Sequence, residues 1–378
     1  MLYQSFSIAA LMGFLTASQV AQSFTIPTAN GFPRPDPEQL STIEVQANGR
    51  LPDLGSPTSL AAEVVTMYQV MAYLEQFEAA YFSSLRSNVS NQEPGYELYN
   101  ESEKADVLES LGHTIAQEQL HAIRAIDILE AVGAFVPVAC EYVVPISTLV
   151  DALDFAETFT AIFLGVMQDF AVILARNGLS DMLRVEPSII GQAGEQNALY
   201  RQGLQRDAVE SPFLTHVPIG LAWSYMRSYT RSGNGCDWPL SNIDLPVFPE
   251  LSPGLRSRLF VPSQDQFVVF SADLVSSADA APYVDSDGSD LYLTWLTGQQ
   301  APRSVPITNV QWLDGTVQFE AQFPYAQDLM SGLSIGVLTT SNDFASAEDI
   351  VGSTLAGPAV IQADEEHPFY TPSPATPA

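Results

Sequence analysis

The sequence predicts an α+β, multidomain protein in which a bundle of four long helices is followed by a small antiparallel β-sandwich domain. Three observations support this prediction. Apolar residues recur at three- and four-residue steps over four long segments within residues 56–232, which is the period of an amphipathic helix. Over residues 263–362 they alternate instead, as in half-buried strands. Residues 233–262, rich in proline, are expected to be a linker.

The composition limits the classes of partner. The chain has 378 residues and a formal net charge of -30, from 44 acidic and 14 basic residues. Phosphate backbones are bound by clustered lysine and arginine, so we expect no nucleic-acid partner. An apolar fraction of 46% is enough to bury sizeable cores, and the length suits two domains at roughly 100–200 residues each.

The N-terminus indicates secretion. Residues 1–23 are expected to be a signal peptide, because the apolar stretch 8–15 is too short to span a bilayer and small residues precede Phe24. No later segment has about 18 uninterrupted apolar residues, so no membrane span is expected. We therefore expect an extracellular protein with a cell-wall or other extracellular partner. Residues 24–55 are expected to be an extended lead-in, and residues 363–378 a Pro/Ser/Thr-rich tail.

Two further features fit an oxidising, extracellular setting. Cys140 and Cys236 are the two cysteines of the chain. They form one disulfide or stay as two buried thiols, and the sequence leaves both possibilities open. Asn88 and Asn100 each begin an Asn-x-Ser sequon in a segment expected to be a loop, so both are candidate glycosylation sites.

The helical part suggests a particular connectivity. The first helix is expected to start at Ser56-Pro57, a good N-cap followed by proline. Residues 134–145 contain two prolines, and about twelve extended residues reach ~40 Å, more than a helix of about 25 residues at ~37 Å. A bundle with one such long crossover is the ferritin-like arrangement. A shorter helix over residues 219–229 is expected to pack outside the bundle. The four long helices are expected over residues 56–86, 103–132, 147–176 and 187–208.

The C-terminal part shows strand patterns at regular spacing. Asp314-Gly315 is a hairpin turn signal between two of the expected strands. Short alternating strands at this spacing predict a sandwich of about 100 residues. The strands are expected over residues 267–271, 291–296, 307–312, 316–323 and 334–340.

Each expected long helix has an acidic residue in its middle, and these are Glu78, Glu118, Glu157 and Glu195. Burial of an acid costs several kcal/mol unless it is paired or binds a metal. His121 follows Glu118 by three residues, so both lie on one helix face. A bundle with two iron or manganese ions uses carboxylates from all four helices and two Glu-x-x-His pairs. Glu75 is a further acid one turn before Glu78, and the sequence leaves open which of the two faces inward.

The fourth helix departs from that pattern. Where a second Glu-x-x-His is required, the chain has Glu195-Gln196-Asn197-Ala198, and alanine ligates nothing. A single-metal or metal-free bundle is therefore at least as well supported as a two-metal centre. A glutamate in an amphipathic helix is also more often solvated at the edge of the apolar stripe than buried.

Two stretches carry a family resemblance. Leu74-Glu75-Gln76-Phe77-Glu78-Ala79-Ala80-Tyr81-Phe82, followed by Gln117-Glu118-Gln119-Leu120-His121, resembles the ferritin-like domain of desiccation-related proteins and of fungal stress-response or late sexual development proteins. The resemblance covers about residues 56–230. It implies a four-helix bundle, secretion and a link to stress or development. The candidate ligands for iron or manganese that it implies are Glu75, Glu78, Glu118, His121, Glu157 and Glu195.

Three functions are compatible with these features, and no catalytic residue is assigned. The first is a degenerate metal-binding bundle used as an extracellular scaffold. The second is an active oxidase-type protein with one or two iron or manganese ions. The third is binding of carbohydrate or cell wall by the β domain, suggested by Trp295, Trp312, Tyr283 and Tyr292.

Overall fold

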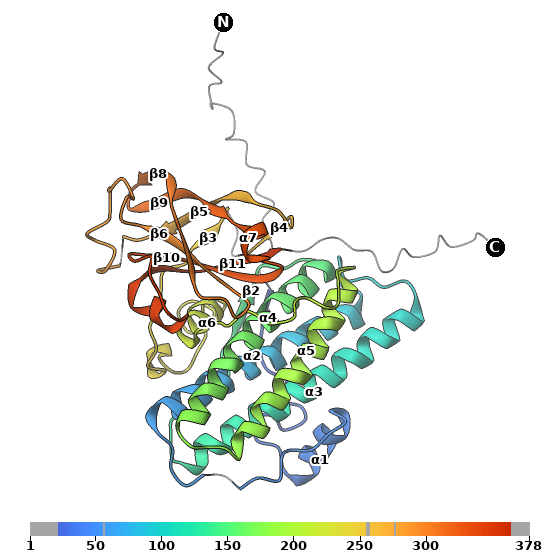
Figure 1. Ribbon diagram of the computed structural model, residues 1–378. Helices are drawn as coiled ribbons and strands as arrows, with labels where there is room; N and C mark the ends of the chain where they lie inside the picture. Colours follow the sequence, from blue (N-terminus) through green and yellow to red (C-terminus); the bar gives the residue numbers. More distant parts are fainter. Residues whose placement is uncertain (1–21, 56, 255–257, 276, 364–378) are drawn as a thin grey trace, which may run out of the picture.

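The computed structural model describes residues 22–55, 57–254, 258–275 and 277–363. It is an α+β structure in which long helices lie beside a smaller β unit (Figure 1). Most of the expected signal peptide and almost all of the expected C-terminal tail fall outside the described residues.

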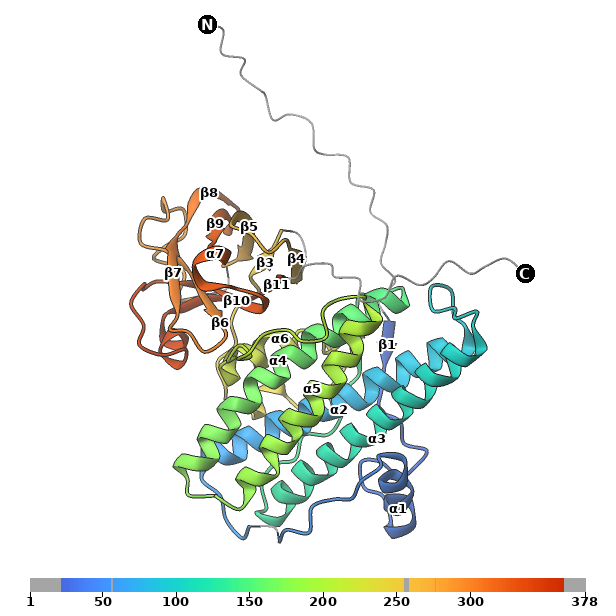
Figure 2. The ribbon, with the colours of Figure 1, turned by 45° about the vertical axis from the view of Figure 1, so that its right-hand side comes forward.

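Four long helices lie side by side (Figures 1 and 2). Helix α2 packs against α3, and α4 packs against α5. Helix α2 is buried without interruption from Met67 to Phe82, because α3, α4, α6 (Ile219–Arg227) and strand β1 (Gln22–Phe24) surround it. Both Glu75 and Glu78 are therefore inside the protein. The four helices are α2 (Ala62–Asn91), α3 (Glu101–Ala131), α4 (Leu149–Arg176) and α5 (Glu186–Gly203).

The expected crossover is present between α3 and α4. Gln69 donates from Nε2 to the Phe135 carbonyl at 3.0 Å, and Gln76, two turns later in α2, donates to the Pro137 carbonyl at 2.9 Å. At the far end, the Leu149 amide donates to the carbonyl of Gly95, which follows α2. The segment thus runs along α2 and carries the chain from one end of the bundle to the other.

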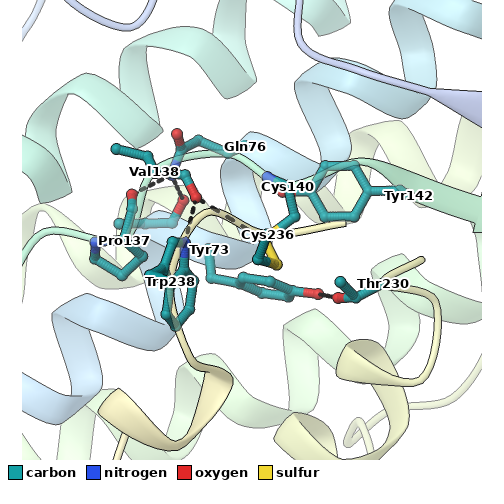
Figure 3. The surroundings of a disulfide bond; sticks show 10 residues. Tyr73, Gln76, Pro137, Val138, Cys140, Tyr142, Thr230, Cys236 and Trp238 are labelled. Atoms are coloured by element: carbon teal, nitrogen blue, oxygen red, sulfur yellow. Dashed lines mark hydrogen bonds between the residues drawn. A yellow bond between two sulfur atoms is a disulfide. The ribbon is translucent and has the colours of Figure 1, made fainter. Parts of the chain in front are cut away.

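A disulfide ties this crossover to the segment after α6 (Figure 3). Cys140 and Cys236 are bonded through their sulfurs, 96 residues apart in sequence. Trp238 donates from Nε1 to the Val138 carbonyl at 2.8 Å, beside the bridge. The crossover also forms strand β2 (Tyr142–Val144), which pairs antiparallel with β1 (Gln22–Phe24). The crossover is therefore held to its neighbours by covalent and hydrogen bonds.

Two expectations about the N-terminal part were wrong. Residues 24–55 contain helix α1 (Pro37–Gln46), because Asp36 caps it with a capping box and Pro37 at the first position suits a helix start. Helix α2 starts at Ala62, not at residues 56–57. The residues just before α2 are largely exposed and Val64 is its first buried residue, and packing supplies most of the stability of a helix in a protein.

The β unit consists of two sheets. The five-stranded sheet has the order β4-β11-β10-β6-β7, and the four-stranded sheet has the order β3-β5-β9-β8. Asp314 and Gly315 both have positive φ and join β8 to β9, so the hairpin prediction is confirmed. The strands are β3 (Ser252–Pro253), β4 (Arg258–Val261), β5 (Gln266–Asp273), β6 (Tyr292–Thr297), β7 (Arg303–Pro306), β8 (Thr308–Leu313), β9 (Thr316–Phe323), β10 (Gly332–Thr339) and β11 (Thr354–Ala363).

The helices and the five-stranded sheet share one hydrophobic core. Ile335 and Val337 of β10 and Val360 of β11 belong to the same buried cluster as the helical core. Helix α6 (Ile219–Arg227) packs on α2 and α4 of the bundle as a fifth helix outside the four, and it is buried because β11 covers it as well. Strand β11 was not expected because all its residues are buried, so it lacks the alternation that marks a strand with one solvated face.

Helix α4 is strongly apolar. Among the described residues, α4 is the helix that is long and apolar enough to cross a membrane, but 78% of its most apolar 18-residue stretch is buried inside the protein. It lies among the other helices of the bundle (Figure 2). The helix that forms the centre of a core has this composition as well.

Gly165 of α4 marks a close approach of the segment before α6. A Cβ on Gly165 would lie 2.5 Å from Cγ2 of Val217 and 2.6 Å from the Thr215 carbonyl oxygen. We expect Gly165→Ala to lower the free energy of unfolding by about 1–3 kcal/mol. Gly191 of α5 is the matched control, because nothing lies within 4 Å of its added Cβ. Gly191→Ala should raise stability by up to about 1 kcal/mol. Urea denaturation measures both, and equal or improved stability of Gly165→Ala would contradict the close approach.

Candidate metal centre

Helices α2 and α3 bring three metal-ligating side chains together. Nδ1 of His121 lies 2.9 Å from Oε2 of Glu118 and 3.4 Å from Oε2 of Glu75. One ligand atom from each of the three residues lies within 4.8 Å of the others. The two glutamates are buried and His121 is largely so. Two neighbouring helices therefore supply two carboxylates and one imidazole to a single place.

Glu78 lies beside this group of three residues. It follows Glu75 by three residues, as His121 follows Glu118, so each pair lies on one helix face. Burial raises the pKa of Glu78 well above its usual value, and the nearby carboxylates of Glu118 and Glu75 raise it further. With Glu78 counted, the cluster contains three glutamates from two adjacent helices.

The charge of this cluster is poorly balanced by the protein. Both carboxylate oxygens of Glu75 are buried without a hydrogen-bond partner in the described part of the chain. Burial raises the pKa of Glu75 to about 8; His121 opposes this shift, and Glu118 adds to it. Burial lowers the pKa of His121, but Glu75 and Glu118 together raise it well above its usual value. With all three carboxyls ionised and the imidazole neutral, these residues would carry a charge of -3. Protons, which the raised pKa values of Glu75, Glu78 and His121 favour, or a bound cation must therefore reduce this charge.

Helix α5 faces this cluster with amides. Gln196 donates from Nε2 to Oε1 of Glu118 at 2.6 Å and to Oε1 of Gln117 at 3.1 Å. Gln192 also donates to Gln117, at 2.8 Å. The Oδ1 atom of Asn197 is buried without a partner among the described residues. The fourth helix therefore contributes neutral groups, which hold a cation more weakly than carboxylates do.

Glu195 is not part of the site, and the prediction that it faces inward was wrong. Its side chain is exposed to solvent. Helix α5 buries Ala193, Gln196, Asn197 and Tyr200, and at 3.6 residues per turn this rotation places Glu195 on the opposite face. The weak periodicity of this helix in the sequence gave no clear indication of its buried face.

Glu157 is buried, but it lies in a different network. Arg201 of α5 donates from Nη1 to its Oε1 at 2.7 Å, and Gln362 of β11 donates to its two oxygens at 3.0 and 2.9 Å. Burial raises the pKa of Glu157 to about 7, and Glu210 adds to the shift. Glu157 therefore joins α4, α5 and β11, and the structure does not bring it together with Glu75, Glu118 and His121 as the sequence led us to expect.

Two charged residues near the cluster were missed. Glu186 is fully buried and accepts a hydrogen bond from the Tyr68 hydroxyl at 2.8 Å. Burial raises the pKa of Glu186, while Tyr68, Arg124 and His121 lower it. Arg124 follows His121 by three residues, a spacing that could have placed it on the same face. Glu186 directly precedes Pro187, which made it resemble an exposed residue of a helix start.

The two sequon asparagines differ in accessibility. Asn88 lies within α2, not in a loop, and its Nδ2 donates to Oε1 of Gln22 at 2.9 Å. Asn100 is exposed and caps α3, with its Oδ1 accepting from the amides of Ser102 and Glu103. A glycan is attached to the amide nitrogen, so Asn100 is the more accessible acceptor of the two.

Comparison with known proteins adds no family to this geometry. The chain matches no protein-family model, and a search of curated proteins finds no match either. The resemblance to ferritin-like proteins therefore depends on the two stretches in α2 and α3 that contain the cluster.

Proposed function

We propose that this chain is a secreted ferritin-like protein, linked to stress response or sexual development, that serves as an extracellular scaffold. Its bundle keeps one metal-binding half-site and has lost the other. The retained half-site consists of Glu75, Glu118 and His121, with Glu78 beside them. The main support for the proposal is the convergence of three ligand atoms within 4.8 Å, one of them from Glu75, whose buried carboxylate makes no hydrogen bond within the described residues.

The donor set favours a divalent ion such as Fe²⁺ or Mn²⁺. Carboxylates and imidazole suit these metals. Two ligands at about 2.1 Å from one ion lie about 3.0–3.4 Å apart, and His121 lies 2.9 Å from Glu118 and 3.4 Å from Glu75. A divalent cation would also reduce the charge of three ionised glutamates from -3 to -1.

A two-metal oxidase centre has less support. The second ion would need acids from α4 and α5, but Glu157 is bonded to Arg201 and Glu195 is exposed. Ala198 stands where the second histidine would be required. Glu186 of α5 is buried but accepts a hydrogen bond from the Tyr68 hydroxyl, and the inward amides of α5 do not compensate the charge of a second ion.

Carbohydrate binding by the β unit also has less support. Trp295 is buried and donates from Nε1 to the Gln322 carbonyl at 2.9 Å. Trp312 is partly buried and donates to the Ser286 carbonyl at 2.8 Å. Sugar platforms need an exposed aromatic face, whereas these rings serve the interior of the sandwich.

The test is a titration of the metal-free, full-length mature protein with Mn²⁺, followed by calorimetry and elemental analysis. We expect the bundle to bind one ion. Glu118→Gln keeps the shape of the side chain and removes its charge, and it should weaken binding at least about 100-fold. Glu195→Gln is the matched control, since Glu195 is exposed and should not affect binding.

Two outcomes would contradict the metal-binding proposal. One is equal affinity for Mn²⁺ in Glu118→Gln and the unaltered protein. The other is less than about a tenth of an iron or manganese ion per chain after reconstitution. Equal affinity would mean that Mn²⁺ binds outside this cluster. Absence of bound metal would mean that the buried glutamates are neutralised by protons and that the bundle is a metal-free scaffold.

A further inference from the structure

A second group of metal-type side chains lies where the helices meet the β unit. Asp169 comes from α4, His216 from the segment before α6, and Glu348 from the short 3₁₀ helix η3 (Glu348–Ser353). Nε2 of His216 lies 3.6 Å from Oδ1 of Asp169 and 3.7 Å from Oε1 of Glu348. The three ligand atoms lie within 4.8 Å of one another. None of these residues belongs to the glutamate cluster between α2 and α3.

The distances from Nε2 of His216 to the two carboxylates fit ligands of one metal ion better than hydrogen-bonded partners. Good N–H···O bonds have donor–acceptor distances of about 2.7–3.2 Å, shorter than both distances from His216. Two ligands at about 2.1 Å from a tetrahedral ion lie about 3.4 Å apart. Both carboxylates also approach the same nitrogen of His216, and a single N–H cannot donate well to both. One cation between the three atoms would satisfy all of them.

The surrounding structure holds two of the ligands in place. The Asp169 side chain is nine-tenths buried, and its Oδ2 accepts from the Ile219 amide at 3.1 Å, which leaves Oδ1 for His216. The backbone amide of His216 donates to the Gly298 carbonyl at 3.2 Å. These bonds fix the backbone of His216 and the carboxylate of Asp169 before any ion binds.

The charge of the two carboxylates is not compensated by an ion pair with arginine or lysine in the described residues. Arg176, at the end of α4, is hydrogen-bonded to Glu63, with Nε 3.1 Å from Oε1, and its charge acts on Asp169 and Glu348 without an ion pair to either. His216 lies within 4 Å of both acids, so the position between the three side chains can accept a divalent cation.

A cavity gives solvent access to this place. It has a volume of about 220 Å³ and is lined by residues that include His216, Gly298, Gln299, Ser346 and Glu348. Water from the cavity can fill the coordination positions that three protein ligands leave free.

We propose that Asp169, His216 and Glu348 form a second metal site, which binds a divalent transition metal of the Zn²⁺ type. One imidazole nitrogen and two carboxylates are a donor set that zinc accepts. The ion links α4, the segment before α6 and η3, so its binding stabilises the junction between the helices and the β unit. The site uses its own residues and is independent of the proposed half-site in the bundle.

The experiment is a calorimetric titration with Zn²⁺ of the full-length mature chain in the Glu118→Gln background, which removes the bundle site. We expect this protein to bind Zn²⁺. His216→Ala and Glu348→Gln should each lower the affinity at least about 10-fold. Glu348 is half exposed, with a side-chain exposure of 52%, so its replacement leaves the fold intact. Melting temperature should rise with Zn²⁺ unless one of these residues is replaced.

His113→Ala is the matched control. His113 also has a glutamate near its Nε2, Glu109 at 3.7 Å, but it belongs to no group of three ligands among the described residues. Zn²⁺ affinity should therefore stay unchanged in this variant. Unchanged affinity in His216→Ala and Glu348→Gln, or an equal loss in His113→Ala, would overturn the proposal. Loss of Mn²⁺ binding in Glu118→Gln bears on the bundle alone, so the two failures are distinguishable.

Discussion

Replacing Glu157 with alanine is expected to lower the free energy of unfolding by about 3–5 kcal/mol at pH 8. Burial and Glu210 raise the pKa of Glu157 to about 7. The carboxyl is therefore mostly ionised at pH 8, which is above this pKa. The substitution removes the bidentate partner of Gln362 and one carboxylate partner of Arg201, whose side chain is 3% exposed. Chemical denaturation followed by circular dichroism measures the difference.

Glu195→Ala is the control for that experiment. In the sequence both Glu157 and Glu195 are acids near the middle of a long helix, but in the structure Glu195 is exposed. Its replacement should change the free energy of unfolding by no more than about 0.5 kcal/mol. Equal losses in the two variants would mean that the buried network of Glu157, which joins α4, α5 and β11, does not contribute the expected free energy of unfolding.

Loss of the disulfide is expected to be the other large effect. Cys140 and Cys236 close a loop with a sequence separation of 96 residues. A cross-link that closes a loop of this length raises the free energy of the unfolded chain by about 4–5 kcal/mol at 25 °C, because it lowers the conformational entropy of that chain. Removal of a native disulfide lowers the free energy of unfolding by about 2–5 kcal/mol. The double variant Cys140→Ala/Cys236→Ala should therefore unfold at a distinctly lower denaturant concentration than the oxidised protein.

A reducing agent supplies the control for this second prediction. It should shift the denaturation midpoint of the unaltered protein toward that of the double variant and leave the double variant unchanged. A stability of the double variant within about 0.5 kcal/mol of the oxidised protein would contradict the prediction. It would mean that hydrogen bonds such as that of Trp238 to Val138 hold the crossover without the bridge.

Elements with a strong local signal were predicted well. Helix α3 was expected over residues 103–132 and spans Glu101–Ala131, and strand β9 spans Thr316–Phe323 as expected. Both have one solvated face, so their apolar period is visible in the sequence. Strand β11 is buried over its whole length, and helix α2 is buried on every face from Met67 to Phe82. Such burial weakens the apolar period that would reveal which residues point where, as for Glu75 and Glu78.

The residues of the candidate sites show the same difference between features set by local spacing and features set by packing. The spacing of Glu118 and His121 was enough to predict that they share a helix face, because three residues correspond to nearly one turn. The sequence also shows the strongly acidic character of the chain and predicts the long crossover. The packing of the helices, which the sequence did not reveal, places Glu75 and Glu78 inside the protein and Glu195 in solvent. It also brings Glu157 to Arg201.

The reason is that the rotation of a helix about its axis is set by what packs around it. Residues three apart share a face whatever the helix contacts, whereas the choice between core and solvent depends on neighbours distant in sequence. The group of Asp169, His216 and Glu348 illustrates this most clearly, since its three residues come from segments that only the fold brings together.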